Sequence, residues 1–337
     1  MSDTPRRPKA VFLCDGNQID RVYARGRKAR VAELTDLYAT VVSQAAFDEH
    51  ADALADRQVV FSTWGMPRLR EDQIDRLRSL EVVFYAAGSV KHFAEPYLAR
   101  GIAVVSAWAA NAVPVAEFAL AQILLACKGY FRNATAVTSP EGYRSARAAE
   151  ARGVFGETVA LIGAGMIGRR LIELLKPFTL NVAAVDPFLS DADAAALGVA
   201  KVSLEQAFAE ALVVSNHLPN LPELRGVLNE PLLASMRPGA TFINTGRGAQ
   251  VDEAALAKVF AARPDLTALL DVTFPEPPEA DSPLYRLPNV RISTHIAGSL
   301  GDEVVRMADW MIDEFLAFRC GRPLRYAVTA EQLRTMA

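Results

Sequence analysis

The sequence has few cysteines and no strong excess of charge of either sign. Its three cysteines, Cys14, Cys127 and Cys320, are far apart and form no C-x-x-C pair. This pattern argues against a disulfide framework and a structural zinc site, and it favours a reducing compartment. A net charge of −3 gives no electrostatic reason to expect a nucleic-acid or acidic-membrane partner.

The sequence also lacks the pattern of a secretory signal and of a membrane span. Its N-terminus, M-S-D-T-P-R-R-P-K-A, is polar. The longest apolar run, 118–127, is too short and too interrupted to cross a bilayer. We therefore expect a soluble cytoplasmic protein. Its 337 residues, 51% of them hydrophobic, are enough for two domains.

Short β-rich runs alternate with helix-like segments, which is typical of parallel sheets covered by helices. The runs of the first part are 9–14, 58–63, 81–86 and 102–106. The runs of the second part are 158–163, 181–186, 211–216, 240–245, 267–272 and 290–294. Longer apolar segments predict helices over 113–128 and 302–318. Pro114 is expected in the first turn of the former helix, where a missing N–H costs nothing.

A glycine pattern, G-x-G-x-x-G, lies between a predicted strand and a predicted helix, in L-I-G-A-G-M-I-G-R-R at 161–170. Gly163 permits a tight turn, Gly165 lets a pyrophosphate approach the backbone, and Gly168 lets helix and strand pack closely. The backbone N–H groups of Met166 and Ile167 then face the phosphates at the helix start.

Asp186 ends the next predicted strand, a little over twenty residues past the first glycine. A carboxylate there accepts hydrogen bonds from the adenosine ribose and repels a 2′-phosphate, which favours NAD over NADP. The alternative is that Asp186 only caps the turn before Pro187. Because strand, glycine loop, helix and second strand occur together, we predict a dinucleotide site with NAD as its cofactor.

Further polar groups follow other strands of the second part, where ligands bind in open α/β sheets. We expect these groups to share one sheet edge with the glycine loop: His217-Leu218-Pro219, Gly246-Arg247-Gly248, Asp271, Glu276 and His295. His217 is expected to pack against the cofactor rather than to transfer protons.

Arginine, glutamate and histidine at one sheet edge suit one reaction of a small acid. The planar guanidinium of Arg247 can bind a carboxylate and polarise a carbonyl. His295 can exchange a proton with the substrate oxygen, and Glu276 favours its imidazolium form. Taken singly, each residue has an alternative: Arg247 as a surface arginine, Glu276 as a solvated loop charge, and His295 as a histidine at a strand end. Together, beside a nucleotide loop, they predict an acid–base site without a metal.

As a set, these motifs resemble those of the D-isomer-specific 2-hydroxyacid dehydrogenase family. The matching motifs over 161–299 are L-I-G-A-G-M-I-G-R, V-D-P, H-L-P, I-N-T-G-R-G-A-Q-V-D-E-A-A-L, L-D-V-T-F-P-E-P and T-H-I-A-G-S, in the family's order. N-A-V-P-V-A-E-F at 111–118 and G-R-P-L at 321–324 also match, so the resemblance covers most of the chain.

The resemblance implies an α/β fold of two doubly wound parallel-sheet domains. A Rossmann NAD-binding domain at 109–299 is expected to be inserted into a flavodoxin-like substrate domain made of 1–108 and 300–337. The implied activity is NAD-dependent interconversion of a small D-2-hydroxy acid and its 2-oxo acid. The resemblance also implies a homodimer built around the helix at 113–128.

The resemblance further implies roles for individual residues. Arg247, Glu276 and His295 are expected to carry catalysis, with Asp271 near the nicotinamide. The expected cofactor contacts are Gly163, Gly165, Met166, Ile167, Gly168, Asp186, His217, Leu218, Pro219, Thr245, Gly246, Arg247, Asp271, His295 and Gly298.

One loop departs from the family pattern, because A-A-G-S-V-K-H-F at 86–93 replaces a sequence like G-x-G-V-D-N. The backbone amides of Gly88 and Ser89 are still expected to bind the substrate carboxylate. The missing aspartate, with Lys91 and His92 nearby, leaves the substrate open. Trp64 either narrows the site or packs under a loop. No regulatory domain is expected after residue 325, which argues against the longer phosphoglycerate enzymes.

Two other functions are alternatives. Some relatives of this fold are nucleotide-sensing co-repressors that bind peptide motifs, and intact catalytic residues do not exclude such a role. The absence of basic or disordered tails argues against it. A methyltransferase of Rossmann type fits neither Asp186 nor Arg247.

Overall fold

The computed structural model describes residues 7–148 and 152–335, and the chain divides into two compact units. Unit 1 comprises Met1–Asn111 and Ser299–Ala337, and unit 2 comprises Ala112–Gly298. Unit 2 is therefore an insertion in unit 1. The predicted boundaries, 108/109 and 299/300, lie within three residues of these. The assignment of the substrate to one domain and NAD to the other stays a prediction.

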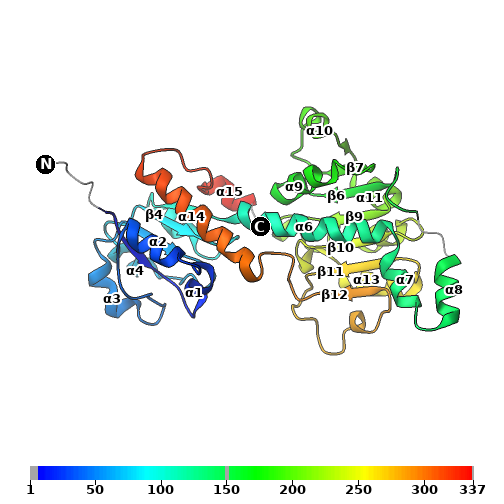
Figure 1. Ribbon diagram of the computed structural model, residues 1–337, viewed down its shortest axis with the longest axis horizontal. Helices are drawn as coiled ribbons and strands as arrows, with labels where there is room; N and C mark the ends of the chain where they lie inside the picture. Colours follow the sequence, from blue (N-terminus) through cyan, green and yellow to red (C-terminus); the bar gives the residue numbers. More distant parts are fainter. Residues whose placement is uncertain (1–6, 149–151, 336–337) are drawn as a thin grey trace. The chain divides into compact units, whose positions relative to one another are not determined.

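Unit 1 is built on a five-stranded parallel sheet in the order β2-β1-β3-β4-β5 (Figure 1). Its strands are β1 (Lys9–Phe12), β2 (Asp36–Leu37), β3 (Val59–Ser62), β4 (Val82–Tyr85) and β5 (Ala103–Ser106). Its helices are α1 (Gln18–Val22), α2 (Arg27–Leu34), α3 (Phe47–Leu54), α4 (Glu71–Arg76), α5 (Ala94–Leu98), α14 (Val304–Arg319) and α15 (Ala330–Thr335). This strand order is that of flavodoxin-like doubly wound sheets.

The core of unit 1 depends on the last long helix of the chain. The rings of Phe61 and Phe84 stack on one face of the sheet, 5.4 Å apart, and Phe315 of α14 packs on Phe61 at the same distance. Met307 and Met311 of α14 join the same cluster. All residues of β3 and β4 are buried, as is usual where helices cover both faces of a parallel sheet.

Unit 2 is built on a seven-stranded parallel sheet in the order β12-β11-β10-β9-β6-β7-β8 (Figure 1). Its strands are β6 (Thr158–Ile162), β7 (Asn181–Val185), β8 (Ala200–Lys201), β9 (Val213–Asn216), β10 (Thr241–Asn244), β11 (Thr267–Leu270) and β12 (Val290–Ile292). Its helices are α7 (Tyr130–Ala136), α8 (Pro140–Ala148), α9 (Met166–Leu175), α10 (Asp191–Leu197), α11 (Leu204–Glu210), α12 (Glu230–Ser235) and α13 (Glu253–Ala262). The order is that of a Rossmann sheet, so the predicted fold class is confirmed for both units.

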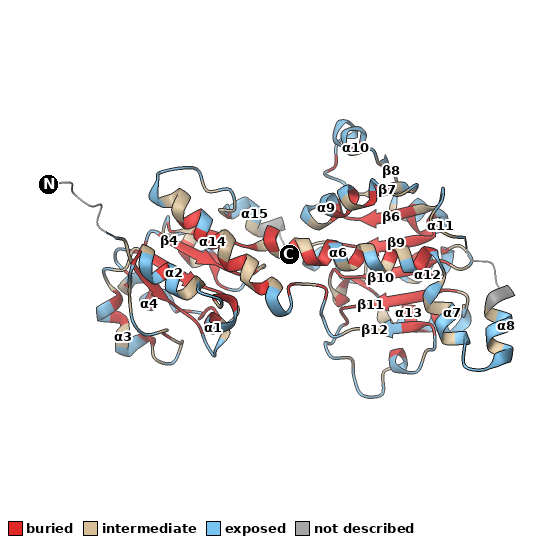
Figure 2. Cartoon of the chain, viewed as in Figure 1, coloured by how far each residue is buried: buried red, intermediate tan, exposed pale blue. Residues whose placement is uncertain are grey.

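Helix α6 (Trp108–Cys127) runs from unit 1 into unit 2 and covers one face of the larger sheet. Its residues Ala116 and Ile123 pack against Leu161 of β6 and Ile243 of β10. Helices α11, α12 and α13 cover the opposite face. Figure 2 shows the central strands as buried, which matches their nearly continuous apolar sequences.

The start of α6 corrects the prediction for Pro114. The helix begins at Trp108, whose N–H donates to the Ser106 hydroxyl at 3.2 Å, five residues before the predicted start at 113. Pro114 consequently lies inside the helix and not in its first turn. A proline there leaves the carbonyl of Ala110 without its usual N–H donor.

Helix α6 is also longer than the apolar run at 118–127. Among the described residues, it is the one helix long and apolar enough to cross a membrane by length and composition. Half of its most apolar window is buried, and Ala116, Ala119 and Ile123 are fully buried in the core of unit 2. A core helix passes the same test, so α6 is weak evidence for a membrane span.

Candidate functional site

The three glycines after β6 have three different surroundings. A Cβ atom on Gly163, where φ is 100°, would lie 2.9 Å from the carbonyl oxygen of His217. A Cβ atom on Gly168 would lie 2.1 Å from the carbonyl oxygen of Gly163. A Cβ atom on Gly165 would meet nothing within 4 Å. Two glycines therefore allow close packing, and Gly165 leaves open space in front of the helix.

That open space lies at the start of α9, and Met166 and Ile167 are the first helical residues. Gly165, the N-cap residue, offers no side-chain cap to the free N–H groups of the first turn. Met166 is exposed. An uncapped helix start without a Cβ in front of it suits a bound pyrophosphate.

Asp186 directly follows β7, and its carboxylate binds the glycine loop. Its Oδ2 accepts the N–H of Ala164 at 2.8 Å, and its Oδ1 accepts the N–H of Phe188 at 2.8 Å. Each oxygen keeps a further lone pair, and the residue is half-buried. A half-exposed carboxylate fixed beside the glycine loop suits the hydroxyls of an adenosine ribose.

His217 follows β9 and is buried. Its Nε2 lies 2.9 Å from the Ser215 hydroxyl, and its Nδ1 lies 3.1 Å from the hydroxyl of Thr245. Burial lowers the pKa of His217 to about 4, so the imidazole is neutral at pH 7. Both ring nitrogens are engaged by hydroxyls, which agrees with the expectation that His217 does not transfer protons. A contact of His217, Leu218 or Pro219 with the cofactor stays a prediction.

Three buried amide side chains join the loop after β9 to the loop after β10. The Nδ2 of Asn216 donates to the Oδ1 of Asn244 at 2.9 Å and to the Oε1 of Gln250 at 2.7 Å. The Nε2 of Gln250 donates to the carbonyls of Leu218 at 3.1 Å and Pro219 at 2.7 Å. We call Asn216, Asn244 and Gln250 the amide triad.

The amide triad holds the backbone on both sides of Arg247. The Oδ1 of Asn244 accepts the N–H of Gly246 at 3.1 Å, and the Oε1 of Gln250 accepts the N–H of Arg247 at 3.0 Å. Gly248 is equally constrained, because a Cβ there would lie 2.0 Å from the backbone of Thr273. The amide triad was not predicted from the sequence.

Arg247 is half-buried, and its guanidinium lies within electrostatic reach of the carboxylate of Glu276. Its Nη1 donates to the carbonyl of Gly246 at 2.7 Å. Burial lowers the pKa of Arg247, and the nearby charge of Glu276 opposes that shift. A fixed, poorly solvated guanidinium interacts strongly with an anion that replaces water beside it.

The turn after β12 holds His295 in a left-handed backbone conformation, with φ of 57°. The buried Asp271 fixes this turn. Its Oδ1 accepts the Ser293 hydroxyl at 2.6 Å and the N–H of Ile296 at 2.9 Å, and its Oδ2 accepts the N–H of Ala297 at 2.9 Å. The carbonyl of Asp271 accepts the N–H of His295 at 2.9 Å. Both carboxylate oxygens of Asp271 thus already have partners within the turn, and its contact with a nicotinamide stays a prediction.

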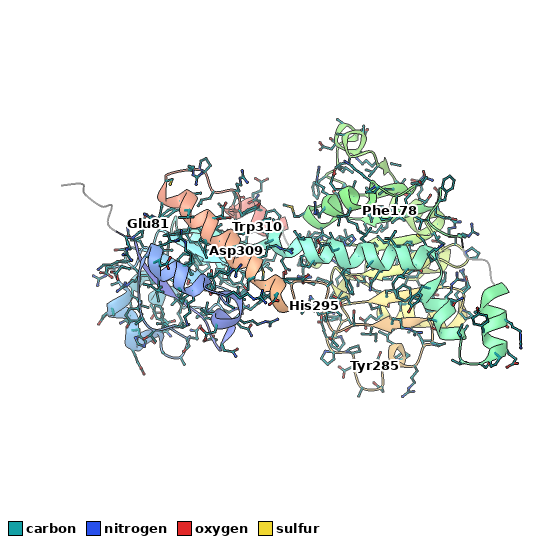
Figure 3. All side chains as sticks on the ribbon, viewed as in Figure 1. Glu81, Phe178, Tyr285, His295, Asp309 and Trp310 are labelled. Atoms are coloured by element: carbon teal, nitrogen blue, oxygen red, sulfur yellow. The ribbon has the colours of Figure 1, made fainter. Side chains whose placement is uncertain are left out.

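His295, labelled in Figure 3, follows β12 at the carboxyl end of the sheet of unit 2. Its side chain forms a direct pair with Glu276. The Nδ1 of His295 lies 2.8 Å from the Oε1 of Glu276, and both side chains are close to half exposed. The pair fixes the ring and leaves the Nε2 as the nitrogen available to another molecule. Glu276 therefore contacts His295 directly and interacts with Arg247 through its charge.

A cavity of about 580 Å³ lies beside this pair, between β12 and the loop that follows β11. It is lined by Asp271, Glu276, Pro277, Tyr285 and Thr294, among others. Neither Arg247 nor the glycine loop lines it. Among the expected cofactor contacts in the described part of the chain, the cavity therefore shares only Asp271. Gly298, another expected cofactor contact, is the last residue of unit 2 and is half-buried.

Gly88 and Ser89 belong to unit 1, where they follow β4 and are half-buried. The Ser106 hydroxyl donates to the carbonyl of Gly88 at 2.6 Å and lies 3.0 Å from that of Ala87. A Cβ on Gly88 would lie 3.8 Å from the Nδ2 of Asn111. This loop is well anchored, and its binding of a substrate carboxylate stays a prediction.

Comparison with known proteins identifies the domain that contains the glycine loop. The family model described as "D-isomer specific 2-hydroxyacid dehydrogenase, NAD binding domain" matches residues 120–297. This match supports the predicted resemblance and the prediction of NAD as the cofactor. The open space at Gly165, the uncapped start of α9 and the fixed carboxylate of Asp186 fit that cofactor.

Relatives of known name include D-3-phosphoglycerate dehydrogenase of Mycobacterium bovis, 37% identical over 204 residues. The aligned part is 60% of this chain and 38% of that relative, so the chain spans less than half the length of this relative. The mitochondrial formate dehydrogenase 2 of Oryza sativa is 29% identical over 290 residues, which cover 83% of this chain and 76% of the relative.

Solved structures share the fold. A phosphoglycerate oxidoreductase from Rhizobium etli has a TM-score of 0.78 at 23% identity, covering 97% of this chain and 99% of the other. A Thermus thermophilus protein called TT0316 has a TM-score of 0.70 at 27% identity, covering 95% of this chain and all of the other.

Proposed function

Because the chain belongs to the D-isomer specific 2-hydroxyacid dehydrogenases, we propose that it interconverts a small D-2-hydroxy acid and its 2-oxo acid with NAD. The observation that carries the proposal is the 2.8 Å pair of His295 and Glu276, with Arg247 within electrostatic reach of Glu276. Relatives named D-3-phosphoglycerate dehydrogenase and formate dehydrogenase support an oxidoreductase of small acids.

The bound nicotinamide accepts or supplies the hydride. Gly163, Gly165 and Gly168 would hold the pyrophosphate against the start of α9, and Asp186 would bind the adenosine ribose. The open space at Gly165 and the fixed carboxylate of Asp186 support this assignment. A negative charge at the ribose also disfavours the 2′-phosphate of NADP.

His295 carries the proton in this proposal. In the direction of reduction, the Nε2–H of the imidazolium donates its proton to the carbonyl oxygen of the substrate as hydride reaches the carbonyl carbon. The 2-oxo acid thereby gains one hydride and one proton and becomes the 2-hydroxy acid. In the reverse direction the neutral Nε2 accepts the hydroxyl proton. Glu276 holds the Nδ1 and stabilises the imidazolium through its charge.

Arg247 binds the anionic end of the substrate in this proposal. Its guanidinium pairs with the substrate carboxylate and polarises the adjacent carbonyl, which lowers the cost of developing negative charge on that oxygen. The amides of Gly88 and Ser89 are proposed as further partners of the same carboxylate. The rigid backbone around Arg247, fixed by the amide triad, supports this role.

The test is NADH oxidation on a panel that includes glyoxylate, hydroxypyruvate and pyruvate, followed as loss of NADH absorbance. We expect turnover on at least one acid. Replacing His295 with Gln should lower kcat roughly 100-fold or more while NADH binding is kept. No turnover across a broad 2-oxo-acid panel, with NADH binding demonstrated, would contradict the proposal. A stable NADH-dependent protein partner together with no turnover would favour the co-repressor alternative.

We further propose that the protein acts in the cytoplasm as a homodimer. Its described cysteines are free, with Cys14 and Cys127 buried and Cys320 exposed, which suits a reducing compartment. A dimer around α6 agrees with the exposed apolar side chains of Leu125 and Tyr130.

A further inference from the structure

Glu276 lies in an exposed stretch of the loop that follows β11. Thr273 is buried, whereas the next four residues, 274–277, are exposed. Pro275 and Pro277 flank Glu276, and a proline has no N–H to donate. Core packing therefore does little to fix this stretch, and few backbone donors remain to anchor it. The position of Glu276 must depend on a small number of specific contacts nearby.

One such contact is a hydrogen bond to Glu253, the first residue of α13. Its Oε1 accepts the N–H of Phe274 at 2.6 Å. The start of α13 is itself fixed, because the side chain of Asp252 accepts the N–H of Ala255 at 3.0 Å. Glu253 is half-buried, and burial raises the pKa of its carboxyl while the bond from Phe274 opposes that shift. A partly desolvated carboxylate binds a backbone N–H strongly.

The ring of Phe274 is held by a second contact. The guanidinium carbon of Arg225, in the loop after β9, lies 4.8 Å from the ring centre, within the range of a cation–π interaction. The residue before Phe274 is also fixed, because the hydroxyl of Thr273 donates to the carbonyl of Pro275 at 2.9 Å. Together these contacts anchor the chain immediately before Glu276.

The pair of Glu276 and His295 does not provide this anchoring by itself. Both side chains are close to half exposed, where water screens their attraction, so the 2.8 Å contact stabilises the loop only weakly. Phe274 precedes Glu276 by two residues, and a hydrogen bond at its N–H therefore limits how far the Glu276 carboxylate can move. A misplacement of about 1 Å is enough to slow a reaction strongly.

Resting on the function proposed above, we propose that Glu253 is a positioning residue of the reaction. By accepting the N–H of Phe274, it holds Glu276 at the distance from which Glu276 pairs with His295. Glu253 does not touch the reacting atoms in this proposal, and its effect reaches them through the loop. All four residues belong to unit 2, so the arrangement is complete within that unit.

The kinetic test compares two substitutions of Glu253. Glu253→Ala removes the acceptor, whereas Glu253→Gln keeps a carbonyl oxygen that can accept the same N–H. With the best acid of the 2-oxo-acid panel, we expect Glu253→Ala to lower kcat roughly tenfold and to leave the KM for NADH within about twofold of the wild-type value. Glu253→Gln should keep kcat within about threefold of the wild-type value. Equal losses in the two variants, or a loss only in the KM for NADH, would overturn the inference and leave the proposed function intact.

The matched control is Glu230→Ala. Glu230 is the first residue of α12, as Glu253 is of α13, and in both helices the preceding residue caps the first turn with its side chain. The carboxylate of Glu230 pairs with the exposed Lys258 at 2.6 Å. The control therefore removes a first-turn carboxylate and leaves the loop of Glu276 intact. We expect an unchanged kcat. A loss as large as that of Glu253→Ala would assign the effect to helix starts in general and contradict the inference.

A structural test separates the two proposals if no acid is turned over. Hydrogen exchange of the Phe274 amide and the ring nitrogen signals of His295, assigned with His295→Gln, are measured by NMR on the full chain. Glu253→Ala should speed the exchange by roughly tenfold or more and shift the His295 signals, whereas Glu253→Gln should do neither. Unchanged His295 signals in Glu253→Ala, with or without faster exchange, would contradict the positioning role, whatever the outcome of the turnover assay.

Discussion

His295 owes its position to a carboxylate that the sequence places 24 residues earlier in the chain. A positive φ is uncommon for a residue other than glycine, and it persists only where surrounding bonds fix it. Asp271 supplies those bonds through its two carboxylate oxygens and its carbonyl. The side chain of His295 is then free to pair with Glu276, because its backbone is already held.

The charge of Glu276 should support proton transfer by His295. In Glu276→Gln the side chain still accepts a hydrogen bond from the Nδ1–H of His295 but carries no negative charge beside the ring. We expect kcat for NADH-driven reduction to fall roughly 10- to 100-fold. The measurement is the rate of NADH oxidation, with Glu279→Gln, in the same exposed loop, as the control. An unchanged kcat would show that Glu276 does not assist His295.

Two glycines of the same loop should respond differently to alanine. In Gly165→Ala the new methyl group meets open space, so stability should be unchanged while NADH binding weakens at least tenfold. In Gly168→Ala the methyl group would lie 2.1 Å from the Gly163 carbonyl, and relieving that contact should lower stability by about 1–3 kcal/mol. Thermal unfolding and NADH fluorescence titration separate the two effects. Normal NADH affinity in Gly165→Ala would rule out a pyrophosphate at this position.

At the scale of elements, hydrogen bonds join the loops after β9 and β10 into one unit. Asn216 and Asn244 end neighbouring strands and are direct register partners, so their amides meet across the sheet. Each member of the amide triad both donates and accepts hydrogen bonds. Carboxylates of the same shape lack the donors, so only amides satisfy this arrangement.

Replacing Gln250 with Glu should therefore loosen both loops. The variant loses the donors to the carbonyls of Leu218 and Pro219, and it places a charge in a position that is 2% exposed. We expect a loss of roughly 2 kcal/mol or more in stability and higher KM values for both NADH and the 2-oxo acid. Gln206→Glu, in an exposed capping box of α11, is the matched control. Unchanged KM values would show that the amide triad does not position Arg247.

The sequence predicted those elements whose signal lies in contiguous residues. Apolar runs revealed ten of the twelve strands in the described part of the chain, and the strand–glycine–helix pattern predicted the dinucleotide loop. The strands β2 and β8 were missed because each has two residues, with no buried one among them. The amide triad was missed because it depends on strand register, which brings Asn216 opposite Asn244. The hydrogen bonds from the His295 turn to Asp271 were missed for the same reason.

At the scale of the whole molecule, buried His217 should make stability depend on pH. Its pKa is about 4 in the folded chain, against roughly 6.5 when unfolded. Between these values only the unfolded chain binds the proton, so the free energy of unfolding should fall by about 3 kcal/mol as pH decreases. Above pH 6.5 this contribution is constant.

Urea unfolding of the wild type and His217→Gln, at several pH values from 8 to 4, measures this effect. The stability difference between the two proteins should be constant from pH 8 to 7 and should then shrink as the pH falls. A difference that stays constant down to pH 4.5 would mean that His217 is not buried as a neutral group.

If the protein is a homodimer, its mass in solution should be twice the mass of one chain. Exposed apolar side chains gather between residues 125 and 155, where Leu125 is 40%, Tyr130 52% and Tyr143 53% exposed. We expect sedimentation at about 73 kDa, twice the 36.5 kDa of one chain. Leu125→Asp with Tyr130→Asp should shift the protein toward the monomer. Tyr285→Asp, an equally exposed tyrosine in another part of unit 2, should not. A wild type that sediments as a monomer would contradict the proposal.

The insertion of unit 2 has a consequence for how the chain matures on the ribosome. Residues 1–111 leave the exit tunnel early, but Phe61 and Phe84 obtain Phe315 as their partner only when α14 has been made. At roughly 5–20 residues per second, the intervening segment takes on the order of 10–40 s to synthesise. During that interval α1 and α2 cover only part of one apolar face of the first sheet, while the uninterrupted unit 2 can finish folding first. We therefore expect a nascent-chain chaperone to bind the N-terminal third of the chain, at apolar residues that α14 covers in the finished protein.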